Sequence, residues 1–166
     1  MTSVSVMTSE IELQERLERL ESESAIRTLV HEYCHGADKR DRARFAAVWT
    51  PDAVWQVAPT QEFRGVEAIC AAVEWQWGAF LQMHHWTSNL VIDLDGDQAR
   101  GEVDVSVTTQ FLDGTWARGG GVYRDSYVRT DVGWRISRRE AEHLFDLDPR
   151  PNVGAGTVAG DASLPS

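Results

Sequence analysis

The spacing of apolar residues divides the chain into a helical first part and a strand-rich second part. Up to residue 49, apolar side chains recur every three or four positions, which is the period of an amphipathic helix. A capping box at Ser9 and Glu12 begins the first helix, Ser22 and Ser24 interrupt it, and Gly36 is a stop signal for the second. A third helix is predicted over about 41–49, and it ends at Thr50-Pro51-Asp52. The apolar stripes of the three helices are, in order, Leu13, Leu17 and Leu20; Ile26, Leu29, Val30, Tyr33 and Ala37; and Phe45, Val48 and Trp49.

The pattern changes after residue 52, where alternating positions typical of strands take over. One strand is predicted over 53–58, one helix over 65–80, and then four strands separated by Asp- and Gly-containing turns. These four strands cover about 83–94, 98–111, 116–129 and 133–145. The order predicts an α+β fold, with N-terminal helices packed on one face of a strongly curved, mainly antiparallel sheet.

Composition changes towards both ends of the chain. Residues 1–8 are predicted to be a flexible leader, 9–145 a single domain, and 146–166 a Pro- and Gly-rich tail. Three glycines in a row, at 119–121, fall inside a predicted strand. They indicate a bulge or a close backbone approach rather than a nucleotide-binding loop.

Charge and composition exclude several classes of function. The 166 residues are 42% hydrophobic with a net charge of −10, which argues against nucleic acid and anionic membranes as partners. The sequence contains neither an apolar run long enough to span a membrane nor a signal-peptide pattern. Two cysteines, Cys34 and Cys70, are too few for a disulfide framework. We therefore expect a cytoplasmic protein with reduced thiols.

The run from Met83 to Leu90 contains the most interesting candidates for chemistry, the neighbouring histidines His84 and His85. The alternation of side chains along a strand does not decide which of the two histidines faces a cavity. His84 shares a face with Trp86, Leu90 and Ile92, as a core or subunit contact would, whereas His85 shares one with Thr87, Asn89 and Val91, as a polar-lined cavity would.

Asp38 is the natural partner for one of these histidines. It follows the apolar stripe at the C-terminal end of the second predicted helix, and Tyr33 lies on the inward stripe before it. A carboxylate that holds one imidazole nitrogen fixes the tautomer and makes the other nitrogen a better base. A metal site is not expected, because the helical pair His31 and His35 has no third ligand of matching type nearby.

The sequence of landmarks resembles the SnoaL-like branch of the NTF2-like (cystatin-cone) superfamily over about residues 10–145. The resemblance lies in their order and spacing. The landmarks are Ala25-Ile26-Arg27-Thr28-Leu29, Tyr33-Cys34-His35-Gly36-Ala37-Asp38, Trp49-Thr50-Pro51-Asp52-Ala53-Val54-Trp55, Gly65 at a helix start, His85-Trp86-Thr87-Ser88-Asn89, Asp95-Gly96-Asp97-Gln98-Ala99 and Gly133-Trp134-Arg135-Ile136.

Within that superfamily the chain looks most like the lyases scytalone dehydratase, bile-acid 7α-dehydratase and the LinA-type dehydrochlorinase. The resemblance implies that His85 is the base, that Asp38 orients it, and that Tyr33 occupies the place of a catalytic tyrosine. Trp55 and Arg139 match pocket positions of the dehydrochlorinase, and Asn89 lies four residues after His85 as it does there. The dehydrochlorinase has Lys at the Tyr33 position, so neither leaving group nor substrate is implied.

The expected function is a cofactor-independent lyase that catalyses β-elimination on a hydrophobic cyclic or aromatic small molecule. His85 removes a proton, Asp38 stabilises the imidazolium, Tyr33 protonates or holds a leaving oxygen, and Arg139 stabilises anionic charge. The alternatives are an isomerase, a polyketide-cyclase-type enzyme, or a non-catalytic small-molecule-binding protein. Candidate pocket walls, which are equally suited to core packing, are Trp55, Trp75, Trp77 and Phe80.

A homo-oligomer is expected as well. Apolar residues at outward strand positions and seven Trp need cover. The resemblance to the lyases implies a trimer, with a dimer as the alternative.

Overall fold

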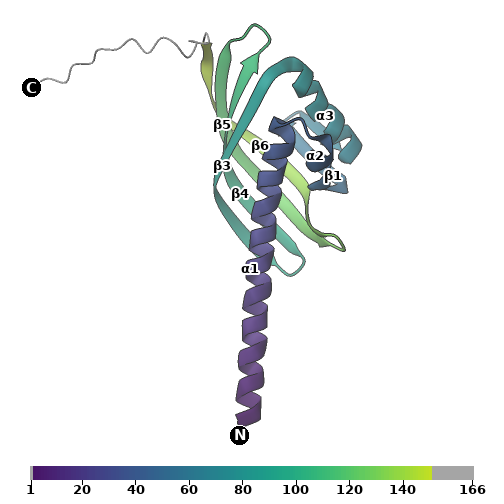
Figure 1. Ribbon diagram of the computed structural model, residues 1–166, viewed down its shortest axis with the longest axis vertical. Coiled ribbons are helices and arrows are strands. Elements are labelled where there is room, and N and C mark those ends of the chain that lie inside the picture. The colour runs from purple at the N-terminus through teal and green to yellow at the C-terminus, as the bar shows by residue number, and fades with distance from the viewer. Residues whose placement is uncertain (1, 151–166) are drawn as a thin grey trace, which may run out of the picture.

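The computed structural model describes residues 2–150, with the side chains of residues 10–147 (Figure 1). Two helices come first and a third lies between the second and third strands of one continuous sheet, which confirms the predicted α+β class. The elements are α1 (Thr2–Asp38), α2 (Arg42–Ala47), β1 (Trp49–Ala58), β2 (Gln61–Arg64), α3 (Val66–Ala79), β3 (Phe80–Asp95), β4 (Gln98–Phe111), β5 (Trp116–Thr130) and β6 (Gly133–Arg150).

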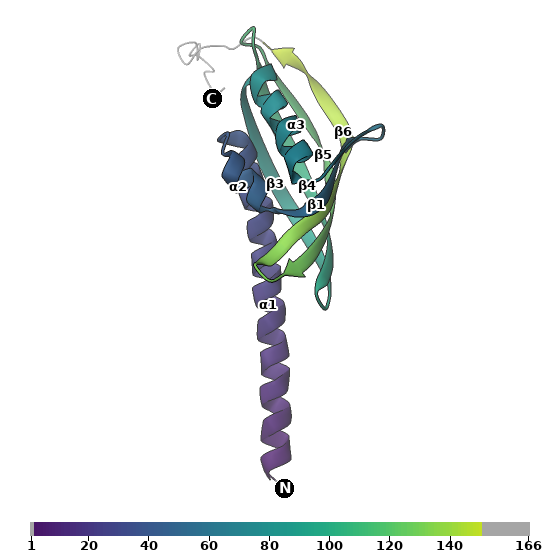
Figure 2. The same cartoon turned by 90° about the vertical axis from the view of Figure 1, so that its right-hand side faces the viewer.

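The six described strands form one mixed sheet in the order β2-β1-β6-β5-β4-β3. Neighbouring strands are antiparallel except β1 and β6, which pair in parallel. The sheet curves around α3, which lies across its concave side together with the C-terminal part of α1 (Figure 2). This geometry leaves one face of the sheet for a core and a site, and the other for solvent or a partner.

The core forms where the predicted helical stripe meets the apolar side of the strands. The stripe from Ile26 to Ala37 is buried, as expected from its spacing. On β4 the side chains of Ala99, Val103 and Val105 are buried, while Arg100 and Glu102 are exposed between them. The alternation along this strand therefore separates a core face from a solvent face.

Helix α1 differs from its prediction, because one helix replaces the two that were expected. Ser22 does not interrupt it, since its hydroxyl donates to the Glu18 carbonyl at 2.6 Å and accepts from Arg129 Nη2 at 2.9 Å. The helix also begins at Thr2, so the backbone of residues 2–8 is helical rather than a loose leader. Its N-terminal half projects from the rest of the fold in both views (Figures 1 and 2).

Gly36 was predicted to stop the helix, but α1 continues to Asp38. The glycine instead allows a close helix–helix approach, because a Cβ there would lie 2.7 Å from the backbone of Phe45. The glycines at 119–121 behave as predicted. The β5–β6 register shifts between Gly120 and Gly121, and a Cβ on Gly121 would overlap the Glu142 carbonyl.

The ends of the sheet extend beyond their predictions. Strand β6 runs to Arg150, so residues 146–150 of the predicted tail are strand, and residues 151–166 lie outside the described residues. The short edge strand β2 was not predicted. No described helix is both long enough and apolar enough to cross a membrane.

Candidate active site

The C-terminal end of α1 and the middle of β3 bring Asp38 and His85 into contact. The Nδ1 atom of His85 lies 2.5 Å from Oδ1 of Asp38. The second carboxylate oxygen, Oδ2, accepts a hydrogen bond from the His85 backbone N–H at 2.8 Å. Both side chains are 8% exposed, so bulk water is largely excluded from the pair. The carboxylate therefore fixes the ring orientation and leaves Nε2 as the free nitrogen.

Two neighbouring contacts hold the end of α1 against β3. The indole Nε1 of Trp77 donates to the Ala37 carbonyl at 2.7 Å, directly before Asp38. The guanidinium of Arg40 donates to the carbonyls of Phe80 and Leu81 at 2.9 and 3.0 Å. These bonds satisfy carbonyls at the helix end and at the strand start, and so fix the relative position of the two elements that carry the pair.

The choice between the two histidines, which the sequence left open, is resolved by their placement. The His84 side chain is 55% exposed and its ring packs edge-on against Trp86 at 4.1 Å between centroids. Its Nδ1 is 3.6 Å from Asp38 Oδ2, which is beyond hydrogen-bonding distance. His85 is the histidine that faces the core side of the sheet.

A bulge overturns the predicted parity beyond this point. The β3–β4 register shifts between Ser88 and Val91, and Asn89 has the left-handed φ of 57°. Leu90 and Ile92 therefore lie on the His85 face, while Asn89 is exposed and donates to Asp104 at 2.7 Å. The prediction that Asn89 shares the His85 face is wrong, because strand parity holds only where the register is unbroken.

Tyr33 and Arg139 lie next to the pair in a buried stack. The Tyr33 ring is edge-on to His85, with 6.1 Å between the centroids, and the Arg139 guanidinium lies 4.1 Å from the Tyr33 ring centroid. The Arg139 guanidinium also lies 4.3 Å from the ring centroid of Tyr123. The resemblance had pointed to Tyr33 and Arg139, and the fold places Tyr33 beside His85 and Arg139 against Tyr33.

Asp125, which the sequence analysis missed, neutralises Arg139. Its carboxylate accepts two bonds, from Nε at 2.7 Å and from Nη2 at 2.6 Å, and both side chains are fully buried. Tyr127 also donates to Asp125, at 2.6 Å. The Nη1 atom of Arg139 has no hydrogen-bond partner among the described residues. The sequence offered one indication of its role, because Asp125 falls on the positions of β5 whose side chains point towards the core.

Burial sets the protonation state of the tyrosines in the stack. Desolvation raises the pKa of Tyr33 to about 12, although the Arg139 charge acts in the opposite direction. Burial likewise raises the pKa of Tyr123 well above its ordinary value. Both phenols are neutral at physiological pH, so either can donate a hydrogen bond.

A cavity of about 260 Å³ opens on the same face of the sheet, and Val105, Val107 and Tyr123 line it. Val107 is the cross-strand partner of His85, and antiparallel partners point to the same face. Tyr123 connects the cavity to the stack, because its ring centroid lies 5.8 Å from that of Tyr33. The cavity floor therefore adjoins the His85–Asp38 pair.

The aromatic residues that were predicted to form the pocket walls lie in several different parts of the structure. Trp55 is buried in an aromatic cluster with Tyr33 and Phe63, and Trp77 braces the end of α1. Phe80 packs against Phe111, with 5.5 Å between the centroids. Trp75 is 72% exposed, and together with Phe63 it lines a second hollow between α3 and β2. Among these aromatics, Trp55 is the one in direct contact with the stack.

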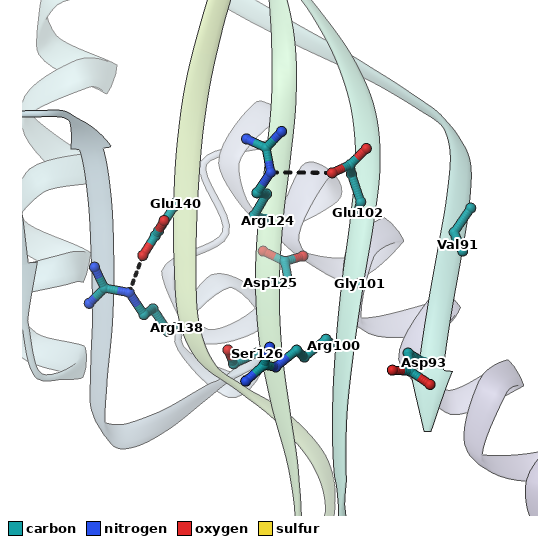
Figure 3. Close-up of a pocket in the computed structure, with 10 residues that line it drawn as sticks. All are labelled: Val91, Asp93, Arg100, Gly101, Glu102, Arg124, Asp125, Ser126, Arg138 and Glu140. Atoms are coloured by element: carbon teal, nitrogen blue, oxygen red, sulfur yellow. Dashed lines mark hydrogen bonds and ion pairs between the residues drawn. The ribbon is translucent and has the colours of Figure 1, made fainter. Parts of the chain in front are cut away.

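A further hollow on the outer face of the sheet has a different character (Figure 3). Two ion pairs lie among its lining residues, Arg124 with Glu102 at 3.2 Å and Arg138 with Glu140 at 2.5 Å. The strand alternation places it on the side of the sheet opposite His85. Over the described residues, no group of three or more His, Cys, Asp or Glu side chains is arranged to hold a metal ion.

Comparisons with known proteins agree with this architecture. The SnoaL-like domain family matches residues 18–140. The chain is 30% identical over 128 residues to the γ-hexachlorocyclohexane dehydrochlorinase of Sphingobium indicum, covering 75% of this chain and 82% of that protein. The crystal structure of a type 2 hexachlorocyclohexane dehydrochlorinase (LinA) superposes with a TM-score of 0.77 at 25% identity, over 83% of this chain and 95% of the other.

An NTF2-like protein with a cystatin-like fold from Novosphingobium aromaticivorans superposes with a TM-score of 0.73 at 26% identity, over 80% of this chain and 88% of the other. The dehydrochlorinases among these relatives support a lyase of the dehydrohalogenase type. The superfamily suggested by the sequence landmarks is confirmed. The match to residues 18–140 shows that this chain belongs to the SnoaL-like domain family.

Proposed function

We propose that this chain is a cofactor-independent lyase that catalyses β-elimination on a hydrophobic cyclic or aromatic small molecule. The observation that carries the proposal is the 2.5 Å contact between His85 Nδ1 and Asp38 Oδ1 in a site that excludes most water. A histidine held in this way presents Nε2 as a base. Its carboxylate neighbour stabilises the imidazolium that forms when Nε2 takes a proton.

The reaction balances with the groups at the site. His85 Nε2 removes a proton from carbon, the C–H electrons form a double bond, and the leaving group departs with its own bonding pair. A halide leaves as the ion, whereas an oxygen leaving group takes up a proton, which the neutral Tyr33 phenol can donate. Arg139 lies against Tyr33, and its positive charge favours the negative charge that develops there.

The cavity floor and the relatives support the proposed class of substrate. Val105 and Val107 offer an apolar surface beside His85, which suits a hydrophobic ring. The relatives named as dehydrochlorinases favour a halogenated ring as the first compound to test.

The test compares wild-type protein with His85→Ala in an untargeted metabolite screen that includes γ-hexachlorocyclohexane. The wild type is expected to convert a compound into a product lighter by a small molecule, water or hydrogen halide, and His85→Ala is expected to lose this conversion. His31→Ala, which replaces an exposed histidine on α1, serves as the control. A product of unchanged mass would indicate an isomerase, and equal conversion by His85→Ala would refute the role of His85.

A further inference from the structure

A second histidine–aspartate pair lies on the same cavity, at its β6 side. The Nε2 atom of His143 lies 3.0 Å from Oδ2 of Asp146, and both residues line the cavity that adjoins His85. Neither residue belongs to the His85–Asp38 pair or to the Arg139 stack.

A bulge in β6 brings these two residues to one face. Gly121 pairs with His143 but Gly120 pairs with Phe145, so β6 has one extra residue, Leu144, at this point. In a regular strand, residues three apart point to opposite faces of the sheet. The extra residue shifts the alternation by one position, so that the side chains of His143 and Asp146 both face the concave side of the sheet.

The strand register connects the two pairs across the sheet. Asp146 is paired with Gly119, Gly119 with Val107, and Val107 with His85. The neighbouring row runs from His143 through Gly121 and Val105 to Thr87. Each row crosses three strand spacings, about 14 Å along the sheet. A floor of valine and glycine therefore separates two polar ends.

Gly119 provides the room in which the second pair sits. A Cβ at this position would lie 2.9 Å from Oδ1 of Asp146 and 3.4 Å from Cε1 of His143. The His143 and Asp146 side chains are 60% and 76% exposed, so their mutual attraction contributes little to folding. The pair is open to the cavity rim and can hydrogen-bond to a ligand.

We propose that His143 and Asp146 anchor the polar end of the substrate, across the apolar floor from His85. This inference rests on the proposed function and specifies its substrate: a hydrophobic ring compound with a hydroxyl group at the end remote from the reacting C–H bond. Both an imidazole and a carboxylate accept hydrogen bonds, so they bind a hydroxyl donor and disfavour an anionic group.

The test uses two probes that differ only in the hydroxyl group, cyclohexylbenzene and 4-cyclohexylphenol, with binding measured by the change in tryptophan fluorescence. Wild-type protein is expected to bind the phenol about tenfold more tightly, which is the effect of one hydrogen bond to a charged group. In His143→Leu and Asp146→Asn this preference is expected to fall below about twofold, while the affinity for cyclohexylbenzene stays within about twofold.

Two further variants make the outcome decisive. Gly119→Ala, which crowds the pair without removing it, is expected to reduce the preference, and the exposed His31→Leu is expected to retain it. An unchanged preference in His143→Leu and Asp146→Asn, or no binding of either probe to wild type, overturns the anchor. His85→Ala is expected to keep the preference for the phenol. The binding preference for the phenol thus reports on the anchor, whereas the conversion of substrate reports on the elimination chemistry.

Discussion

Arg139 is a full positive charge in a completely buried position, and its surroundings explain why the fold tolerates it. Asp125 binds it through two hydrogen bonds, and the rings of Tyr33 and Tyr123 lie 4.1 and 4.3 Å from the guanidinium carbon. A charge taken out of water needs such partners, because desolvation otherwise costs several kcal/mol. The same contacts hold the guanidinium against the ring of Tyr33, whose hydroxyl we propose as a proton donor.

Removal of the partner should therefore be severe. Asp125→Ala is expected to lower the free energy of unfolding by about 3–5 kcal/mol, since it leaves a buried guanidinium without its counterion. Chemical denaturation monitored by tryptophan fluorescence measures this change. The control is Glu140→Ala, which breaks the partly exposed ion pair with Arg138 and should cost less than about 1 kcal/mol. A small change in Asp125→Ala would show that Arg139 does not depend on this pair.

The residues of the candidate site that could be predicted are those marked by the local apolar pattern or by the family resemblance. Tyr33 and Asp38 fall on and directly after an apolar stripe, and the landmarks indicated His85. Asp125 was missed, because a lone acidic residue on a strand carries no local mark of the buried cation it faces. Trp77 is a brace for the end of α1, which only the tertiary contact reveals.

At the level of elements, helices and strands were predictable because their periods differ, whereas irregularities within them were predictable only where glycines marked them. The bounds of the four long strands agree with prediction to within a few residues at most ends. The bulges at Asn89 and Leu144 each change which side chains share a face. The three glycines at 119–121 indicated the second bulge from the facing strand, whereas no glycine marks the first. Ser22 was read as a helix breaker, although its hydroxyl bonds within the helix.

Two glycine substitutions test how closely the helices pack. Gly36→Ala is expected to destabilise the protein by about 1–3 kcal/mol, because the new methyl group would lie 2.7 Å from the Phe45 backbone. Gly78→Ala, on α3 with nothing within 4 Å, should instead be neutral or stabilising by up to about 1 kcal/mol. Thermal unfolding of both variants gives the comparison. An equal unfolding temperature in the two variants would mean that α1 and α2 can move apart without loss of stability.

For the whole molecule, the order of elements was sufficient to predict one layer of helices on one curved sheet. The projection of α1 was not predictable, since a helical stripe does not show whether anything packs against it. Leu13 and Leu20 on this helix are exposed, as are Trp86 and Val91 on the outer side of β3. These apolar side chains are available for contacts with another molecule.

We predict that the chain assembles into a homotrimer that covers outer-face residues such as Trp86 and Val91. Light scattering coupled to size-exclusion chromatography should then give a mass about three times that of the 18.6 kDa chain. Trp86→Asp, which places a charge on this face, should shift the mass towards the single chain, whereas Trp75→Asp, on exposed α3, should not. A wild-type mass of one chain at micromolar concentration would contradict the trimer.

The proposed elimination starts when one imidazole, oriented by one carboxylate, removes a proton from the substrate. The direct measurement is kcat for His85→Ala and Asp38→Asn on the compound found by the metabolite screen, with folding verified by circular dichroism. Loss of a general base costs about 10²–10⁴-fold in rate, so His85→Ala should fall by at least about a hundredfold and Asp38→Asn should also fall. A folded His85→Ala variant with wild-type kcat would contradict the mechanism.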